Sequence, residues 1–166
     1  MATVSGRTAK RMKEKPAAPT WHDLARLTDQ KRARWARSTN GTSWVACGTR
    51  WDAVAIAPME TGLTALTGLR IGTRRDRLVL VDHLRDVLYV MVPPGSGAVC
   101  DGIAGVRVLS RGHQLLMPTT YGDSTAAADL ISHPRDGEPP ALVPADRLAA
   151  RLRELAAHTP ETAAVS

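Results

Sequence analysis

The chain has 166 residues, of which 43% are hydrophobic, and it contains 13 Gly, 11 Pro and 2 Cys. This length and composition fit one ordinary soluble domain with a tail or two, and they exclude two full domains, a collagen-like repeat and a disulfide framework. The 22 Lys and Arg residues outnumber the 16 Asp and Glu residues, which gives a net charge of +6. A single hydrophobic core and an anionic partner are therefore expected.

The positive charge is concentrated at the N-terminus. Residues 1–38 carry ten basic and three acidic groups, a net charge of +7, whereas residues 39–166 carry twelve basic and thirteen acidic groups, a net charge of −1. This distribution is typical of a protein that contacts a polyanion through its N-terminus. Nucleic acid, an anionic membrane surface and an acidic protein all fit that description, and a solubilising tail is the alternative.

Two further features of the composition indicate the source and the compartment. Arg is frequent, Ala is abundant and Phe is absent, a pattern that the codons of a GC-rich, actinobacterial genome produce without any selection for phosphate binding. Cys47 and Cys100 lie outside any C-x-x-C pair, so we expect two buried thiols. The sequence shows neither the apolar stretch of a secretory signal nor that of a membrane-spanning helix, and the expected location is cytoplasmic.

The first 38 residues divide into two basic segments. Residues 1–19 lack apolar periodicity and are expected to form a flexible basic arm. Residues 20–38 place Trp21, Leu24 and Leu27 on one stripe, followed by basic residues in the last two turns, which predicts a cationic amphipathic helix. The candidate nucleic-acid contacts in these segments are Lys10, Arg11, Lys13, Lys15, Lys31, Arg32, Arg34 and Arg37.

A sheet body is predicted over residues 42–118. The segments 43–47 (SWVAC) and 51–57 (WDAVAIA) are rich in Val, Ile and Trp, which predicts two short strands that form a hairpin. Pro58 stands at the first position of a segment with leucines at helical spacing, which predicts a helix over 58–69.

The next strands are predicted from apolar runs. Residues 78–82 (LVLVD) and 86–92 (DVLYVMV) are strand candidates on either side of a short polar turn. Residues 105–110 (GVRVLS) and 113–118 (HQLLMP) predict a second hairpin in which either Val106 and Val108 or their neighbours face inwards.

The last part of the chain is predicted to be irregular and then helical. Residues 119–141 are expected to be irregular, with one helical turn around 125–131, and residues 143–157 have the pattern of an amphipathic helix. Residues 159–166 are expected to form a disordered tail.

These elements predict one α+β domain over residues 20–158. It has a small mixed or antiparallel sheet of about five to six strands, packed by two helices and preceded by the basic amphipathic helix. At least two of Trp35, Trp44 and Trp51 are expected to be buried.

Few residues have a spacing that specifies chemistry. The five histidines lack metal-ligand spacing, so neither a metal site nor a cofactor is expected. The neighbouring Asp82 and His83 are the best local acid/base candidate, although adjacent strand residues point to opposite faces, and a solvated strand end is the alternative. Arg74 and Arg75, with Arg77, form a second cationic patch that fits either a phosphate contact or a solvated loop.

Two stretches carry a family resemblance: WVACGTRWDAVAIAPMETGLTAL at 44–66 and RVLSRGHQLLMPTT at 107–120. The first resembles the glycine turn, catalytic strand and following helix of the bifunctional DNA primase/polymerase N-terminal domain, in its short actinobacterial members. The second resembles a late hydrophobic strand of that family, which leads into a loop. With a late helical segment, PPALVPADRLAARL, the resemblance covers about residues 40–155 and implies a primase/polymerase-like fold.

The chain departs from the resembled family at the catalytic strand. Polymerising members place two carboxylates, one residue apart, at the end of that strand, where they hold two divalent ions. Here Ile56, Ala57 and Pro58 occupy the position, Glu60 is the nearby acid, and residues 86–89 replace the family's glycine-histidine nucleotide motif. Since one carboxylate cannot assemble a two-metal site, the resemblance implies a member that has lost polymerase chemistry.

The leading hypothesis is a non-catalytic, primase/polymerase-like, DNA-associated accessory or regulatory protein, with a plasmid as the expected genetic setting. Its basic N-terminus would contact DNA phosphates without reading sequence. The alternative is a protein-interaction or membrane-surface component of conjugative plasmid transfer or spread, whose cationic end binds an acidic protein or an anionic membrane. An enzyme that uses Asp82, His83 or Glu60 on a small molecule has the least support.

Overall fold

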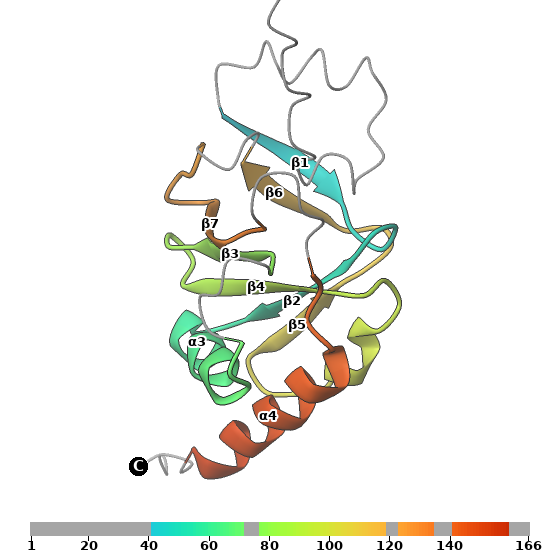
Figure 1. Cartoon of the computed structure of the whole chain (residues 1–166), viewed down its shortest axis with the longest axis vertical. Coiled ribbons are helices and arrows are strands. Elements are labelled where there is room, and N and C mark those ends of the chain that lie inside the picture. Colours follow the sequence, from blue (N-terminus) through green and yellow to red (C-terminus); the bar gives the residue numbers. More distant parts are fainter. Residues whose placement is uncertain (1–40, 72–76, 119–122, 135–140, 160–166) are drawn as a thin grey trace, which may run out of the picture.

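The computed structural model describes residues 41–71, 77–118, 123–134 and 141–159 (Figure 1). The predicted basic arm and basic helix lie outside these ranges, as does nearly all of the predicted C-terminal tail. The elements in chain order are β1 (Thr42–Ala46), β2 (Asp52–Ile56), α3 (Met59–Gly68), β3 (Val79–Asp82), β4 (Val87–Val92), the 3-10 helix η1 (Gly97–Cys100), β5 (Val106–Leu109), β6 (Gln114–Pro118), β7 (Asp129–Ser132) and α4 (Ala145–His158).

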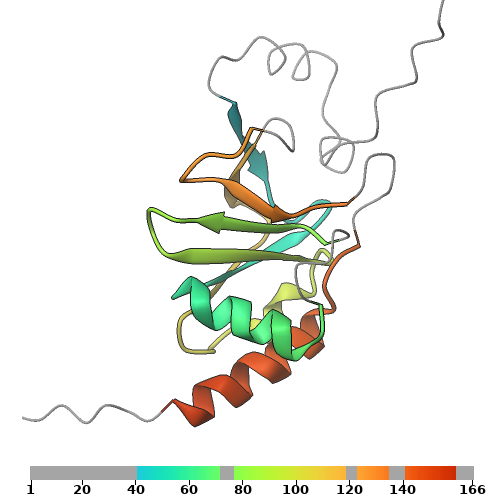
Figure 2. The ribbon, with the colours of Figure 1, turned by 60° about the vertical axis from the view of Figure 1, so that its left-hand side comes forward.

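The strands form a main sheet and a separate ribbon. The five-stranded sheet has the order β5-β2-β4-β3-β7, the two-stranded ribbon pairs β1 with β6, and every pair is antiparallel. Helices α3 and α4 cover one face of the sheet, the helix face, and the ribbon lies over the other, the ribbon face (Figures 1 and 2). The α+β prediction is therefore confirmed, with two α-helices and seven strands among the described residues.

The helix face holds a buried apolar core. Because side chains alternate along a strand, Val54 and Ile56 of β2 and Leu88 of β4 point towards the helices, where Leu148 and Leu152 of α4 meet them. All five are at most 1% exposed. The periodic leucines of the C-terminal segment thus bury one stripe of α4 and leave its charged stripe in water.

A glycine lets α3 approach this face closely. A Cβ atom added at Gly62 would lie 2.4 Å from Cδ2 of Leu88, which is closer than real carbon atoms approach. The helix occupies Met59–Gly68, within the predicted range of 58–69.

The ribbon face has smaller side chains on its central strands. Ala53 and Ala55 of β2 point to this side, with Tyr89 of β4, and the ribbon covers them with Val45 and Met117. Cys47 belongs to this cluster and Cys100 to the helix-face cluster, so the two predicted buried thiols are confirmed on opposite faces of the sheet.

Both predicted hairpins are wrong. The strand at 43–47 pairs with β6 rather than with β2, and β2 pairs instead with β4 and β5. All five residues of β2 are buried, whereas β1 buries one. A strand buried on both faces requires neighbours on both edges and cover on both sides, so β2 belongs inside the sheet and β1 belongs in the covering ribbon.

Two predictions in the second half also need correction. The helical turn expected around 125–131 is replaced by β7, which pairs with β3 at the edge of the sheet. The last helix begins at Ala145, two residues later than predicted, because Pro144 is its extended N-cap and the chain still lies along the sheet at Val143. Its backbone N–H donates a hydrogen bond to the carbonyl oxygen of Met91 at 3.0 Å, and its side chain is fully buried.

Candidate functional site

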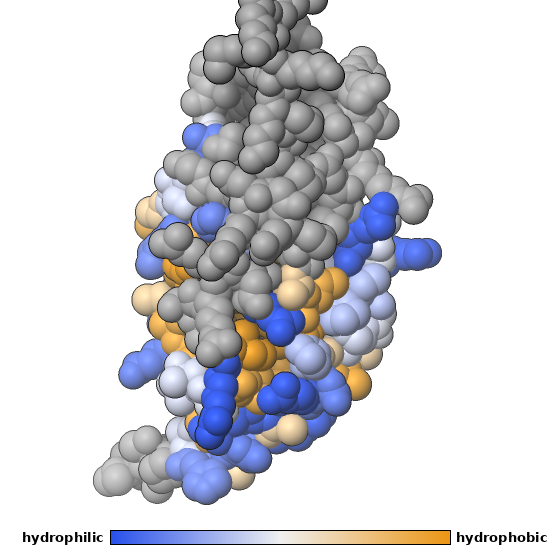
Figure 3. Space-filling view, in the orientation of Figure 1, coloured by the Kyte–Doolittle hydropathy of each residue, from blue (hydrophilic) through white to orange (hydrophobic). Residues whose placement is uncertain are grey.

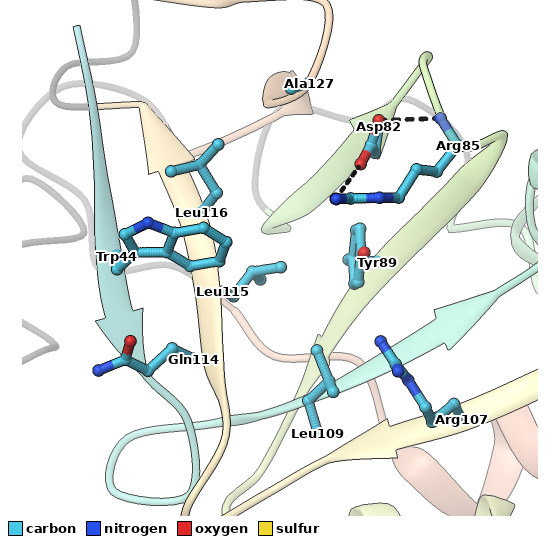
Figure 4. Close-up of a pocket in the computed structure, with 10 residues that line it drawn as sticks. All are labelled: Trp44, Asp82, Arg85, Tyr89, Arg107, Leu109, Gln114, Leu115, Leu116 and Ala127. Carbon is cyan, nitrogen blue, oxygen red and sulfur yellow. Dashed lines mark hydrogen bonds and ion pairs between the residues drawn. The ribbon is translucent and has the colours of Figure 1, made fainter. Parts of the chain in front are cut away.

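A hollow of about 390 Å³ lies between the ribbon and the ribbon face of the sheet. We call it the ribbon hollow, and Figure 4 shows its two sides. The side formed by the ribbon is largely apolar, and the side formed by the sheet carries the charged groups. The lining residues are Trp44, Gln114, Leu115 and Leu116 from the ribbon, Asp82, Arg85, Tyr89, Arg107 and Leu109 from the sheet and its β3–β4 turn, and Ala127 before β7.

The register of the sheet brings the polar residues of the hollow together. Ala55 of β2 is paired with Tyr89 of β4 on one side and with Arg107 of β5 on the other. All three side chains therefore point to the same face. Because a methyl group stands between the two longer side chains, space remains above the strand. Figure 4 shows the guanidinium groups of Arg85 and Arg107 on opposite sides of Tyr89.

Asp82 is a structural carboxylate of this site. Its side chain is 3% exposed. Its Oδ1 accepts backbone N–H hydrogen bonds from Leu84 at 3.0 Å and Arg85 at 3.1 Å, and its Oδ2 lies 3.2 Å from Nη1 of Arg85. A buried charge needs such partners to offset the loss of hydration. Asp82 thus fixes the β3–β4 turn and holds the Arg85 guanidinium at the edge of the hollow.

Tyr89 supplies a neutral hydroxyl. Burial raises the pKa of its phenol above 10.0, the nearby Asp82 carboxylate raises it further, and Arg107 and Arg85 partly oppose both effects. The group therefore stays protonated at neutral pH and is able to donate a hydrogen bond.

Arg107 is the available cation of the hollow. Its guanidinium carries a permanent charge, and among the described residues no acidic side chain forms an ion pair with it. The Arg85 side chain is 73% exposed even though it contacts Asp82. Two guanidinium groups against one carboxylate give the lining a positive balance, which favours an anion.

Trp44 supplies an exposed aromatic surface beside these charges. Its side chain is 59% exposed, and its strand partner in β6 is Leu116. An exposed indole that lines the same hollow as two guanidinium groups is typical of a surface that contacts flat, negatively charged ligands. Trp51, in contrast, is 1% exposed, and Trp35 lies outside the described residues.

A second hollow of about 340 Å³ has a different chemistry. It lies beside η1 and the N-terminal end of α4, where Figure 3 shows apolar surface above α4. Asp146 is the charged residue of its lining, so an anion is disfavoured there. The lining consists of Pro93, Ser96, Val99, Leu142, Pro144, Ala145 and Asp146.

The nucleic-acid contacts predicted from the sequence are not among the residues that form the ribbon hollow. Of the second cationic patch, Arg74 and Arg75 also lie outside the described ranges. Arg77 is described, and its Nη1 donates to the carbonyl oxygen of Leu142 at 2.5 Å, so it contributes to packing. The basic residues outside the described ranges are Lys10, Arg11, Lys13, Lys15, Lys31, Arg32, Arg34, Arg37, Arg74 and Arg75.

The acid/base candidates are held apart in the structure. His83 does not share a hydrogen bond with its neighbour Asp82, because its Nε2 lies 2.9 Å from Oδ2 of Asp129 across the sheet edge. Glu60 is exposed in the first turn of α3, on the helix side. Ile56, at the position where the resembled family has a carboxylate, is fully buried on the helix face.

Sequence analysis missed the ribbon hollow. Arg85 and Arg107 stand 22 positions apart and Trp44 comes from another sheet, so no local pattern joins them. The alternation of β1 was one signal for the exposed indole. Neighbouring strand residues point to opposite faces, so the burial of Val45 directs Trp44 away from the core.

Within the described ranges, no cluster of three or more His, Cys, Asp or Glu side chains has a geometry that would hold a metal ion. No helix in the same part of the chain combines the length and apolar character needed to cross a membrane. Comparison of the chain with models of protein families, with curated proteins and with solved structures finds no match.

Proposed function

We propose that this protein is a non-catalytic, primase/polymerase-like accessory or regulatory protein that associates with DNA through its basic N-terminus. The observation that carries the proposal is the charge distribution, with a net +7 over residues 1–38 beside a nearly neutral remainder. Lys and Arg side chains that neutralise phosphates release condensed counterions, and this gives sequence-independent, salt-sensitive binding.

The ribbon hollow gives this proposal a second support. Its two guanidinium groups and exposed indole are the side chains that contact phosphates and bases in other nucleic-acid sites. The sequence at the end of β2 supports a non-catalytic role, because Ile56, Ala57 and Pro58 provide no carboxylate for divalent ions.

The test is a salt-titrated binding experiment with the full chain. Fluorescence anisotropy with labelled single- and double-stranded DNA compares the wild type with a variant in which Lys31, Arg32, Arg34 and Arg37 are replaced by Ala. We expect the fourfold variant to bind all sequences more weakly. The slope of log K against log[salt] should fall by about 0.7–0.9 for each phosphate that the variant no longer neutralises. Arg147→Ala, which removes one exposed charge from α4, is the control for loss of a basic side chain outside the N-terminus.

Three outcomes would contradict the proposal. An unchanged binding constant in the fourfold variant at low salt would remove the N-terminus as the contact. Equal affinity for heparin would reduce the interaction to general charge attraction. Sedimentation with anionic liposomes in the absence of DNA binding would favour a membrane-surface component of plasmid transfer, since polybasic segments bind anionic lipids.

A further inference from the structure

Trp44 provides a stacking surface that is largely exposed in the described part of the fold. A large aromatic side chain in a small protein normally contributes most of its area to the core, yet 59% of this one is exposed. It is held on a strand that pairs along five residues with β6, so the ring is presented from a fixed backbone. A ligand with a flat apolar face would bury this ring without moving the ribbon.

The opposite side of the hollow provides charges suited to phosphate. Figure 4 shows the guanidinium groups of Arg85 and Arg107 on opposite sides of Tyr89, and the positive charge of each lowers the pKa of its hydroxyl. Asp82 orients Arg85 without covering it, and no acidic side chain among the described residues forms an ion pair with Arg107. A guanidinium group binds phosphate oxygens through paired N–H donors.

The exposed indole and the two guanidinium groups together favour single-stranded over double-stranded nucleic acid. In a duplex, each base is stacked on its neighbours and paired at its edge, so its face cannot reach Trp44. In a single strand the base is free to leave the stack, and the phosphates on either side remain within reach of basic side chains. A volume of about 390 Å³ lies within the range of sites for small organic ligands, so it accommodates a base with its sugar rather than a double helix.

We infer that the ribbon hollow binds single-stranded nucleic acid, with one base stacked on Trp44 and the adjacent phosphates held by Arg85 and Arg107. This inference rests on the proposed association with DNA and assigns to the folded body a contact separate from the basic N-terminus. Tyr89, as a protonated hydroxyl between the two cations, donates to a phosphate oxygen or to the base edge.

The experiment measures binding of the full chain to a fluorescently labelled oligothymidylate and to a duplex of equal length. Trp44→Ala should weaken single-strand binding about 5- to 150-fold, since one base–aromatic stack is worth about 1–3 kcal/mol. Trp44→Phe keeps an aromatic face and should retain most of the affinity. Arg107→Ala should also weaken binding and lower the salt slope by about 0.7, the single-strand value for one phosphate.

Two controls distinguish an effect at the ribbon hollow from a general loss of positive charge and from a loss of folded structure. Arg147→Ala removes an equal charge from α4, on the other side of the sheet, and should bind like the wild type. Urea unfolding of Trp44→Ala should resemble that of the wild type, because the ring is mostly exposed. Binding of the duplex should change less than about twofold in both Trp44 variants, because a paired base does not reach the indole.

Three other results would overturn all or part of this inference. If Trp44→Ala and Arg107→Ala bind single strands as Arg147→Ala does, while the fourfold N-terminal variant loses affinity, the hollow is excluded and the proposed function remains. If no variant and no wild-type protein binds DNA, both are overturned. If adenosine monophosphate displaces the strand at an equal concentration of nucleotide, the hollow is a site for free nucleotides, and the assignment to a strand is wrong.

Discussion

The two faces of the five-stranded sheet are made by the same strands and differ in how they are closed. On the helix face, Val54, Ile56 and Leu88 meet two helices and form a buried apolar core. On the ribbon face, Ala53 and Ala55 meet a narrow two-stranded ribbon, and a hollow with charged walls remains. Alternation along β2 puts the larger side chains towards the helices and the smaller ones towards the hollow.

Because of this difference, the helix face contributes most to stability, and the ribbon face holds the candidate binding site. Two helices bury a broad apolar stripe, and such burial contributes about 25 cal/mol per Å². A two-stranded ribbon covers less area, so the sheet residues beyond its reach must tolerate water. Arg107 of β5 and Arg85 of the adjoining β3–β4 turn lie there, and both residues are exposed. The face with the weaker cover is therefore the one that keeps the ribbon hollow.

The largest effect is expected from truncation on the helix face. Ile56→Ala should lower the free energy of unfolding by about 2–5 kcal/mol, because it leaves a cavity at a fully buried position. Urea denaturation followed by circular dichroism measures the change. Leu63→Ala, on the exposed side of α3, is the control and should cost less than about 1 kcal/mol. Equal losses in the two variants would show that the helix face is not the main source of stability.

An intermediate effect is expected at the buried carboxylate of the ribbon face. Asp82→Ala should lower the free energy of unfolding by about 1–3 kcal/mol, because the N–H groups of Leu84 and Arg85 lose their acceptor. Asp82→Asn keeps one acceptor oxygen and should recover part of the loss. The same urea assay tests both variants, and a stability of Asp82→Ala equal to that of the wild type would disprove this role of the carboxylate.

A further effect, confined to high pH, is expected from the two thiols, one beneath each face. Burial raises the pKa of Cys47 from 9.0 to about 11, with a further contribution from Asp52. Burial also raises the pKa of Cys100 to about 11, opposed by Arg153 and increased by Asp101. Above about pH 9 the unfolded chain loses these protons while the folded chain keeps them. Their contribution to stability is therefore complete below about pH 9 and is lost as the pH rises through about 11.

The urea midpoint measured between about pH 8 and pH 11 checks this expectation. Cys47→Ala and Cys100→Ala should each show a shallower fall at high pH than the wild type does. If one variant alone has a shallower slope, the thiol on the other face is accessible to water. Identical slopes in all three proteins would contradict the burial of both thiols.

Local pattern in the sequence was sufficient for most elements. The alternation in AVAIA predicts a strand, the leucines after Pro58 predict α3, and those after Pro144 predict α4, because each pattern repeats with the period of its own backbone. The charge difference between residues 1–38 and the remainder was likewise determined by sequence alone.

Strand pairing and the ribbon hollow were decided by the tertiary structure. The turn at Gly48 looked like the tip of a hairpin, yet it carries the chain from the ribbon into the sheet, and β1 finds its partner in β6. Which strands pair depends on how both faces of β2 become buried, and that is a property of contacts distant in sequence. Trp44, Arg85 and Arg107 surround one hollow for the same reason: the sheet register, rather than any spacing in the chain, sets their positions.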